Sequence, residues 1–362
     1  MISNLVDPKN FNKIVDGKNI VLFTLTNKNG LTTQITNFGG RIVSLFTPDL
    51  NGDFEDIVLG YDNIESYMKP PKEIYLGALI GRYANRITKG RFKLNGTTLK
   101  TAINNQPNHL HGGLKGFSNV VWNATLLDKQ NLELSYLSLD GEEGYPGELK
   151  VTVIYRLTDE NSLKIEYHAT TNKPTPINLT NHSYFNLNGA ASGSIENHLL
   201  KLNANYYLPI DCFSIPKGKS ASVINSPFDF RTLKRIGKDI NTNDKQLKIA
   251  KGYDHNFICN TSKKEDIAAY VVDPISKRTL TVYTNEPGIQ FYSGNYITGC
   301  GIGKKRTTYL NRNAFCLETQ HFPNSPNQQN FPSTILNTNE AYHSFCCYKF
   351  GIKKPSNISY LF

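Results

Sequence analysis

Hydrophobic and polar residues alternate along this chain in many short runs, which is the pattern of half-buried β-strands. Turn-forming residues separate some of these runs, including Asn27-Lys-Asn-Gly30 and Asn95-Gly96, and such turns between alternating runs predict antiparallel hairpins. The expected strands form two early hairpins, a three-strand meander and a later hairpin. In chain order they are 20–26 with 31–36, 91–94 with 97–100, 132–139 with 149–157 and 163–170, and 269–272 with 279–283.

Helical periodicity is almost absent. Residues 61–68 and 233–240 are the two stretches that could each hold a short turn or helix. No linker rich in Pro, Gly or Ser divides the chain, and no fixed-period repeat is present. We therefore expect a single all-β domain over residues 1–362, built as a large antiparallel sandwich with ligand sites on loops or on an open sheet face.

Composition and charge exclude several classes of protein. The 362 residues are 39% hydrophobic and 11% aromatic, as in a globular protein with a large core. The net charge of +10, from 40 basic and 30 acidic residues, is spread in short separated groups, so we expect no nucleic-acid partner. No apolar run reaches membrane-spanning length, and we expect no membrane partner either.

The six cysteines form no CxxC pair and have no zinc-site spacing with histidine. Six are too few to staple a chain of this length, so free thiols in a reducing compartment are expected. The first residues lack the basic and apolar regions of a signal peptide. These features predict a cytoplasmic protein.

One run of residues breaks the strand pattern. Residues 178–187, Asn-Leu-Thr-Asn-His-Ser-Tyr-Phe-Asn-Leu, place His182 among amides, hydroxyls and two aromatic rings. Hydrogen-bonding groups are costly to bury without partners, so this run is better suited to the wall of a polar pocket than to a core. Its imidazole could give or take a proton near neutral pH. The alternative is a core histidine satisfied by backbone groups.

A second polar segment, Gly81-Arg-Tyr-Ala-Asn-Arg86, follows an apolar run. Asn85 and Arg86 would offer an amide and a fixed fork of hydrogen-bond donors to a ligand. The alternative is that Arg86 pairs with a buried carboxylate.

A third segment, Asn108-His-Leu-His-Gly-Gly113, has histidines at alternate positions. In an extended chain His109 and His111 would face the same side. No carboxylate or third ligand lies near them in the sequence, so we expect no metal site. A hydrogen-bonding histidine beside glycines that allow close backbone approach is the better interpretation.

Two later segments place polar groups between aromatic residues. Asp254 lies in Gly252-Tyr-Asp-His-Asn-Phe257, where it could cap a turn or accept hydrogen bonds from hydroxyls. Gln290 lies beside two rings in the segment 286–295, a pairing typical of sites that bind flat polyols.

The segment Phe315-Cys-Leu-Glu-Thr-Gln-His-Phe-Pro323 places Glu318 directly after an apolar run. Partial desolvation at the end of a buried strand would raise the pKa of this carboxyl toward the working pH, as a general base needs. The alternative is a carboxylate paired with Arg86 or Arg312.

Taken together, these segments resemble the aldose 1-epimerase (galactose mutarotase) family. The resemblance covers about residues 37 to 332, nearly the whole chain. The matching segments are Asn37–Arg41, Asp56–Gly60, Gly81–Ile87, His109–Gly113, Gly144–Gly147, Asn178–Leu187, Gly252–Phe257, Pro287–Asn295 and Phe315–Gln320.

This resemblance implies a β-supersandwich that binds a free hexose such as glucose or galactose and interconverts its α and β anomers without a cofactor or metal. It also implies that Glu318 is the general base at the anomeric hydroxyl and His182 the general acid at the ring oxygen. The remaining implied site residues bind the sugar: Asn85, Arg86, His111, Ser183, Tyr184, Asp254 and Gln290. The partner is thus a small aldose, and the protein is expected to be a monomer or homodimer.

Tyr83 departs from the family pattern, which usually has a small aliphatic residue at that position, and the segments 197–226 and 297–308 could hold loop differences. Three other functions remain open at this stage. They are a hexose-6-phosphate 1-epimerase, a non-catalytic sugar-binding protein on the same scaffold, and a glycoside hydrolase, which would need two carboxylates flanking the bond.

Overall fold

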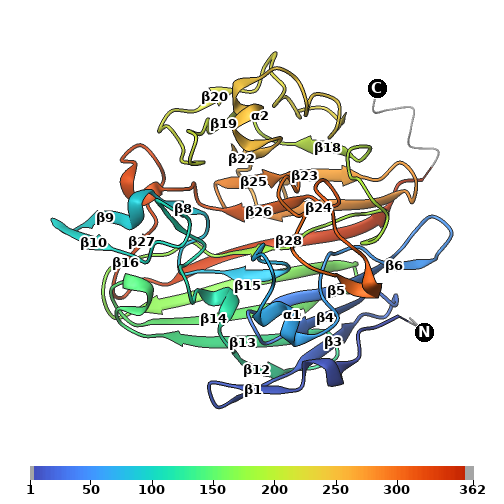
Figure 1. Ribbon diagram of the computed structural model, residues 1–362, viewed down its shortest axis with the longest axis horizontal. Helices are drawn as coiled ribbons and strands as arrows, with labels where there is room; N and C mark the ends of the chain where they lie inside the picture. The colour runs from blue at the N-terminus through green and yellow to red at the C-terminus, as the bar shows by residue number, and fades with distance from the viewer. Residues whose placement is uncertain (1–3, 355–362) are drawn as a thin grey trace.

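The computed structural model describes residues 4–354, and its largest sheet is antiparallel with nine strands. Figure 1 shows its long central strands side by side across the middle of the molecule. In spatial order the strands are β12 (Asn123–Leu126), β13 (Asn131–Ser138), β14 (Leu149–Leu157), β15 (Ser162–Thr171), β28 (Tyr342–Ile352), β24 (Arg278–Thr284), β23 (Ile267–Val272), β18 (Leu199–Leu202) and β21 (Lys234–Arg235).

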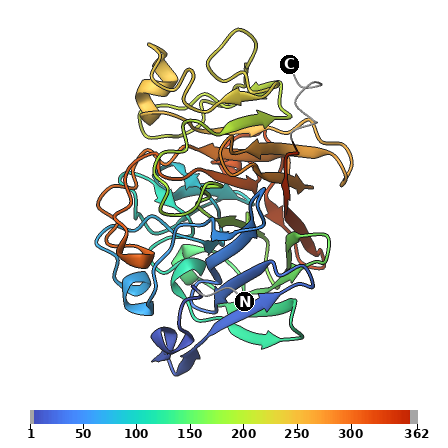
Figure 2. The same cartoon turned by 90° about the vertical axis from the view of Figure 1, so that its right-hand side faces the viewer.

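Two smaller antiparallel sheets pack with this large one. In Figures 1 and 2 the blue N-terminal strands lie toward the bottom and the yellow segment with α2 lies at the top. The five-stranded sheet has the order β20 (Ala221–Ser222), β19 (Tyr206–Tyr207), β22 (Asp254–Ile258), β25 (Gly288–Tyr292), β26 (Cys316–Gln320), and the four-stranded sheet has the order β3 (Leu22–Thr26), β4 (Thr32–Thr36), β5 (Arg41–Pro48), β6 (Phe54–Asp56).

Short two-stranded pairs complete the described sheets and include the segments expected to carry the site. These pairs are β7 (Ala78–Ile80) with β17 (Thr180–His182), β8 (Arg86–Ile87) with β11 (His109–Leu110), β9 (Arg91–Leu94) with β10 (Thr97–Lys100), β1 (Lys13–Val15) with β2 (Lys18–Ile20), and β16 (Thr175–Pro176) with β27 (Ile335–Leu336).

The predicted all-β class is confirmed, and each predicted hairpin is present. β3 pairs with β4, β9 with β10, and β23 with β24, while β13, β14 and β15 form the expected meander. Alternation fixes which residues are buried: β14 follows an inside–outside pattern along all nine of its residues.

One hydrophobic cluster joins the three larger sheets. It contains Val153 and Ile165 from the nine-stranded sheet, Ile35 from the four-stranded sheet, and Phe257 and Leu317 from the five-stranded sheet. These side chains are almost completely buried. The sheets therefore pack face to face as a sandwich, and the faces turned away from this cluster are free to carry polar groups.

The helix prediction was right at one place and wrong at another. α1 (Ile64–Met68) lies inside the predicted stretch 61–68 and is capped by Asn63, whose side chain accepts the Ser66 N–H. The stretch 233–240 is not helical, because its residues Lys234 and Arg235 form β21 and pair with β18. Long-range strand pairing overrides the weak local preference there.

The second helix, α2 (Lys245–Ala250), was not predicted. Asp244 caps it by accepting hydrogen bonds from the backbone N–H groups of Gln246 and Leu247. At six residues it is too short to show a helical period, and only the cap could have indicated it.

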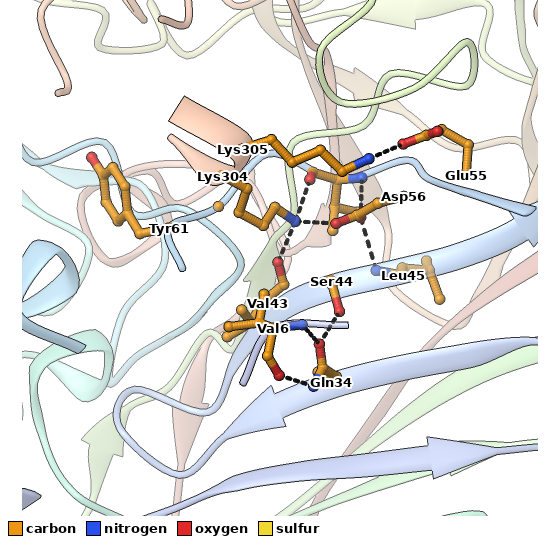
Figure 3. Close-up of polar contacts among 12 residues, drawn as sticks. Val6, Gln34, Val43, Ser44, Leu45, Glu55, Asp56, Tyr61, Lys304 and Lys305 are labelled. Atoms are coloured by element: carbon orange, nitrogen blue, oxygen red, sulfur yellow. Dashed lines mark hydrogen bonds and ion pairs between the residues drawn. The ribbon is translucent and has the colours of Figure 1, made fainter. Parts of the chain in front are cut away.

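A buried ion pair holds the loop 297–308, one of the segments expected to differ from the family. Figure 3 shows the Lys304 ammonium between the carboxylate of Asp56 and two backbone carbonyls. Its Nζ donates to Asp56 Oδ2, to Val43 O at 2.6 Å and to Val58 O at 2.9 Å. All three protons of the ammonium thus have acceptors, which is the condition under which a charge can be buried.

We expect Lys304→Met to lower the free energy of unfolding by about 3 kcal/mol, because it leaves the Asp56 carboxylate buried without its cation. The neighbouring Lys305 is a matched control, since its ion pair with Glu55 is exposed and such pairs contribute less than about 1 kcal/mol. Urea unfolding of Lys304→Met and Lys305→Met measures the difference between their free energies of unfolding. Equal losses would show that Lys304 does not anchor the loop.

No helix in residues 4–354 is long and apolar enough to cross a membrane. The six cysteines lie within the same described range, and all are free thiols.

Candidate active site

The five-stranded sheet places three predicted site residues on one face. In its register Asp254 pairs with Tyr292, which pairs in turn with Cys316 on the next strand. Two residues further along β22, Asn256 pairs with Gln290, which pairs in turn with Glu318. Residues that pair directly across an antiparallel sheet point to the same side. The neighbouring residues along the strands, such as Leu317, point to the other side and belong to the main hydrophobic cluster.

β17 brings His182 to this same face. Its ring Nε2 lies 3.6 Å from Glu318 Oε1, and its Nδ1 lies 3.5 Å from the Cys316 sulfur. The ring is stacked on Tyr184 at 5.0 Å between centroids. Residues 136 positions apart in the chain (318 − 182) thus form a neighbouring imidazole and carboxyl.

The pair β8 and β11 supplies the opposite wall. The Asn85 N–H donates to Nδ1 of His111 at 3.2 Å, and the Arg86 Nε donates to Asn105 Oδ1 at 3.1 Å. His111 has φ +50°, so the chain leaves the extended conformation at this residue. The ring centroid of His111 lies 5.2 Å from that of His182.

This geometry corrects the expectation that His109 and His111 face the same side. Because β11 ends at Leu110 and His111 has positive φ, the alternation stops between them. His109 instead points inward, with Nδ1 2.7 Å from Ala102 O and Nε2 2.6 Å from the Tyr145 hydroxyl. It is a buried histidine with both ring nitrogens occupied.

A cavity of about 330 Å³ lies between these walls. Seven of the predicted residues line it: Asn85, Arg86, His111, His182, Tyr184, Asp254 and Glu318. The two others do not. The Ser183 hydroxyl points away and donates to Asn181 Oδ1 at 2.6 Å, and Gln290 lies behind Asp254, donating from Nε2 to Asp254 Oδ1 at 2.7 Å.

Sequence reasoning missed several lining residues. Tyr75 packs edge-on against His111 at 4.7 Å between centroids, and Tyr292, Tyr296 and Asn105 also face the cavity. The rings beside Gln290 were a usable signal for Tyr292, since it lies opposite Asp254 in the register. Tyr75 has no comparable signal, because it comes from a loop with φ +60° at that residue.

Burial controls the protonation of the central groups. It lowers the pKa of His182 to about 3 and that of His111 well below its usual value, the latter also through the neighbouring His182. It raises the pKa of Glu318 well above its usual value, assisted by the Asp254 charge and opposed by Arg86. Burial likewise raises the pKa of Asp254, against Arg86 and Gln290.

His111, His182 and Glu318 bring three potential metal-ligand atoms within 4.8 Å of one another. The expectation that no carboxylate accompanies His111 was therefore wrong, because the fold places Glu318, from a strand distant in the sequence, beside it. The tautomer decides against metal binding at this place, because Nδ1 of His111 accepts the Asn85 N–H and its proton is on Nε2. His111 is thus arranged as a hydrogen-bond donor toward the cavity.

The structure also tests the alternative of an ion-paired Glu318. Arg312 pairs with Glu196 at 3.3 Å instead. Among residues 4–354 no carboxylate lies within ion-pair distance of Arg86, whose charge acts on Glu318 only from further away. Glu318 is left with Oε2 buried and without a hydrogen-bond partner in the described protein.

The fold and the site together define a class of protein: a β-sandwich with a polar cavity that holds a closely spaced imidazole and carboxyl among hydrogen-bonding groups. Three comparisons identify the family within that class. The family model described as aldose 1-epimerase matches residues 21–349.

Curated relatives match over most of their length. The chain is 44% identical to a galactose mutarotase of Bos taurus over 89% of this chain and 92% of that one. It is 37% identical to an aldose 1-epimerase of Escherichia coli, over 92% and 96% respectively. A solved structure of a galactose 1-epimerase from Lactobacillus acidophilus superimposes with a TM-score of 0.82 at 31% identity, covering 94% of this chain and 97% of that one.

The chain belongs to the aldose 1-epimerase family. It is therefore an isomerase, and the family resemblance expected from its motifs is confirmed.

Proposed function

We propose that this enzyme interconverts the α and β anomers of free aldohexoses in the 330 Å³ cavity, with Glu318 as general base and His182 as general acid. The observation that carries these roles is the 3.6 Å separation of His182 Nε2 and Glu318 Oε1 inside a cavity walled by hydrogen-bonding groups. The two groups are close enough to act on the two oxygens of one hemiacetal carbon.

Ring opening requires one proton to leave O1 and another to reach O5. Glu318 takes the proton from O1 while His182 delivers one to O5, and the C1–O5 bond breaks to leave an open-chain aldehyde. Rotation about C1–C2 presents the other carbonyl face. Closure then reverses the two proton transfers and gives the other anomer. Each positioned proton transfer contributes a factor of ~10²–10⁴.

The pair Glu318 and His182 works with a single shared proton. Burial raises the pKa of Glu318 and lowers that of His182, so burial alone places this proton on the carboxyl. The arrangement needed for opening has it on the imidazole. Both arrangements contain one proton, so the rate should have a bell-shaped dependence on pH. The two apparent pKa values of that profile belong to the pair and not to either residue alone. Groups that donate hydrogen bonds to Glu318 would raise the population of the reactive arrangement.

The walls of the cavity bind and orient the sugar in this proposal. The N–H of His111 and the guanidinium of Arg86 donate to sugar oxygens, including O5 as negative charge builds on it. Asp254, held by Gln290, accepts hydrogen bonds from hydroxyls. Tyr184, Tyr292 and Tyr296 offer aromatic faces.

The names of the relatives support galactose as one substrate, and the cavity favours an uncharged sugar over a hexose 6-phosphate. Lys72 lines the cavity, but its ammonium donates to the Tyr296 carbonyl. The Nε of Arg86 is occupied by Asn105. Each cation that could recognise a phosphate thus already donates to the protein, and the remaining N–H groups of Arg86 are assigned to sugar oxygens.

Purified protein should speed the polarimetric equilibration of α-D-galactose and α-D-glucose without added metal or cofactor. Glucose 6-phosphate, assayed in the same way, should react at least ~10-fold more slowly in kcat/KM, since that factor corresponds to loss of about 1.4 kcal/mol of binding. Rates equal to buffer with all three sugars would favour a sugar-binding protein on this scaffold. A preference for the phosphate would establish the hexose-6-phosphate epimerase instead.

A further inference from the structure

Behind Glu318 the same sheet face carries buried amides whose polar atoms have no hydrogen-bond partner in residues 4–354. Both side-chain polar atoms of Asn256 and both of Gln320 are unpartnered, together with Oε1 of Gln290 and Oε2 of Glu318. Asn256 is 2% exposed and Gln320 is fully buried. Six such atoms on four neighbouring residues are unusual, because buried polar groups are nearly always satisfied.

Strand register brings these side chains together. Asn256 lies opposite Gln290, which lies opposite Glu318, and Gln320 is two residues beyond Glu318 on the same side of β26. Gly288 lies opposite Gln320, and a Cβ on Gly288 would come within 2.6 Å of Asn256 Oδ1. The Asn256 amide therefore occupies the space that a side chain on Gly288 would take, next to the position paired with Gln320.

These two amides do not line the sugar cavity, where Glu318 presents its other oxygen toward His182. Their partner is therefore expected to be small and polar. Bound water fits, since one buried water typically makes about three hydrogen bonds to otherwise unsatisfied groups. A water here can accept from an amide N–H and donate to Oε2 of Glu318.

We propose that Asn256 and Gln320 are positioning residues that hold Glu318 as a carboxylate through water bound between the two amides and Oε2. The inference rests on the proposed role of Glu318 as the base. Burial and the Asp254 charge both favour the protonated carboxyl, and among charged groups Arg86 opposes them. A hydrated pair of amides adds N–H and O–H donors that favour the ionised form.

The test uses Asn256→Leu and Gln320→Met, which keep nearly the same volume and remove the amides. The pKa of Glu318 is read from infrared difference titration of each protein against the same protein carrying Glu318→Gln. We expect this pKa to rise by roughly one unit in each variant, as loss of a hydrogen-bond donor to a carboxylate should. kcat at neutral pH should fall about tenfold, the same factor in population, while KM changes less than about twofold because neither amide reaches the sugar.

Thr47→Val is the matched control, since the Thr47 hydroxyl is also buried and unpartnered but lies on β5, away from the site. It should move neither the pKa of Glu318 nor kcat. If an amide variant fails to fold, Gly288→Ala gives a second route, because the new methyl group displaces the Asn256 amide. It should also raise the pKa of Glu318.

Three outcomes would overturn the inference: an unmoved pKa of Glu318 in folded variants, a pKa that falls, or a rise in KM without a change in the pKa. The last would mean that the amides contact the sugar directly. Failure of the proposed base role is a separate result, seen as near-normal activity of Glu318→Gln alone. The infrared titration would still report whether the amides act on this carboxyl.

Discussion

Glu318→Gln should lower kcat by at least ~10²-fold, the loss expected when a positioned general base is removed. The amide is nearly the same size and keeps one oxygen, but it cannot take a proton from O1. KM should change little by comparison, because sugar binding is assigned to the cavity walls. Polarimetry with galactose at saturating concentration measures kcat. Thermal unfolding should show no loss of stability, because the change replaces a buried ionisable carboxyl, whose Oε2 has no hydrogen-bond partner among residues 4–354, with a neutral amide.

Glu286→Gln is the matched control for this experiment. Glu286 is an equally buried glutamate, but it accepts hydrogen bonds from His321 and Tyr342 outside the cavity. Its variant should lose stability rather than kcat. If Glu286→Gln and Glu318→Gln reduce kcat to the same extent, the loss comes from disturbing the structure and not from removing a general base.

The fold was accessible from sequence wherever strands pair with their neighbours in the chain. The hairpins of β3 with β4 and β9 with β10 follow from alternation and turn residues, which are local properties. The partnership of β15 with β28 is different, because it joins residues 173 to 187 positions apart, from Ala169 with Tyr342 to Ser162 with Lys349. No local pattern encodes such a pairing, and the false helix at 233–240 failed for the same reason.

The site could be predicted from the sequence to a similar degree. Alternation along β26 places Glu318 and Leu317 on opposite faces, and the position of Glu318 directly after an apolar run already indicated a functional side chain. Register across three strands, by contrast, decides that Gln290 supports Asp254 instead of lining the cavity. Backbone conformation decides that His111 enters the cavity while His109 does not.

His182→Asn should also lower kcat by at least ~10²-fold, since asparagine cannot deliver a proton to O5. The double variant with Glu318→Gln should be little worse than either single variant. Two groups that share one proton act as a unit, so the second substitution removes no catalytic contribution that the first has not already removed. Polarimetry on the two single variants and the double variant measures this non-additivity. Losses that multiply would mean that the two residues act in independent steps.

The control for His182 is His255→Asn, and it separates catalysis from burial. Burial is the main cause that lowers the pKa of both imidazoles to about 3, so the two are matched in desolvation. His255 lies on the opposite face of β22, with Nε2 3.3 Å from Gln246 Oε1. Its loss should weaken packing among the aromatic residues around it and leave most of kcat intact. Because the two variants delete the same group from equally buried positions, a large kcat loss confined to His182→Asn assigns the proton transfer to the imidazole beside Glu318.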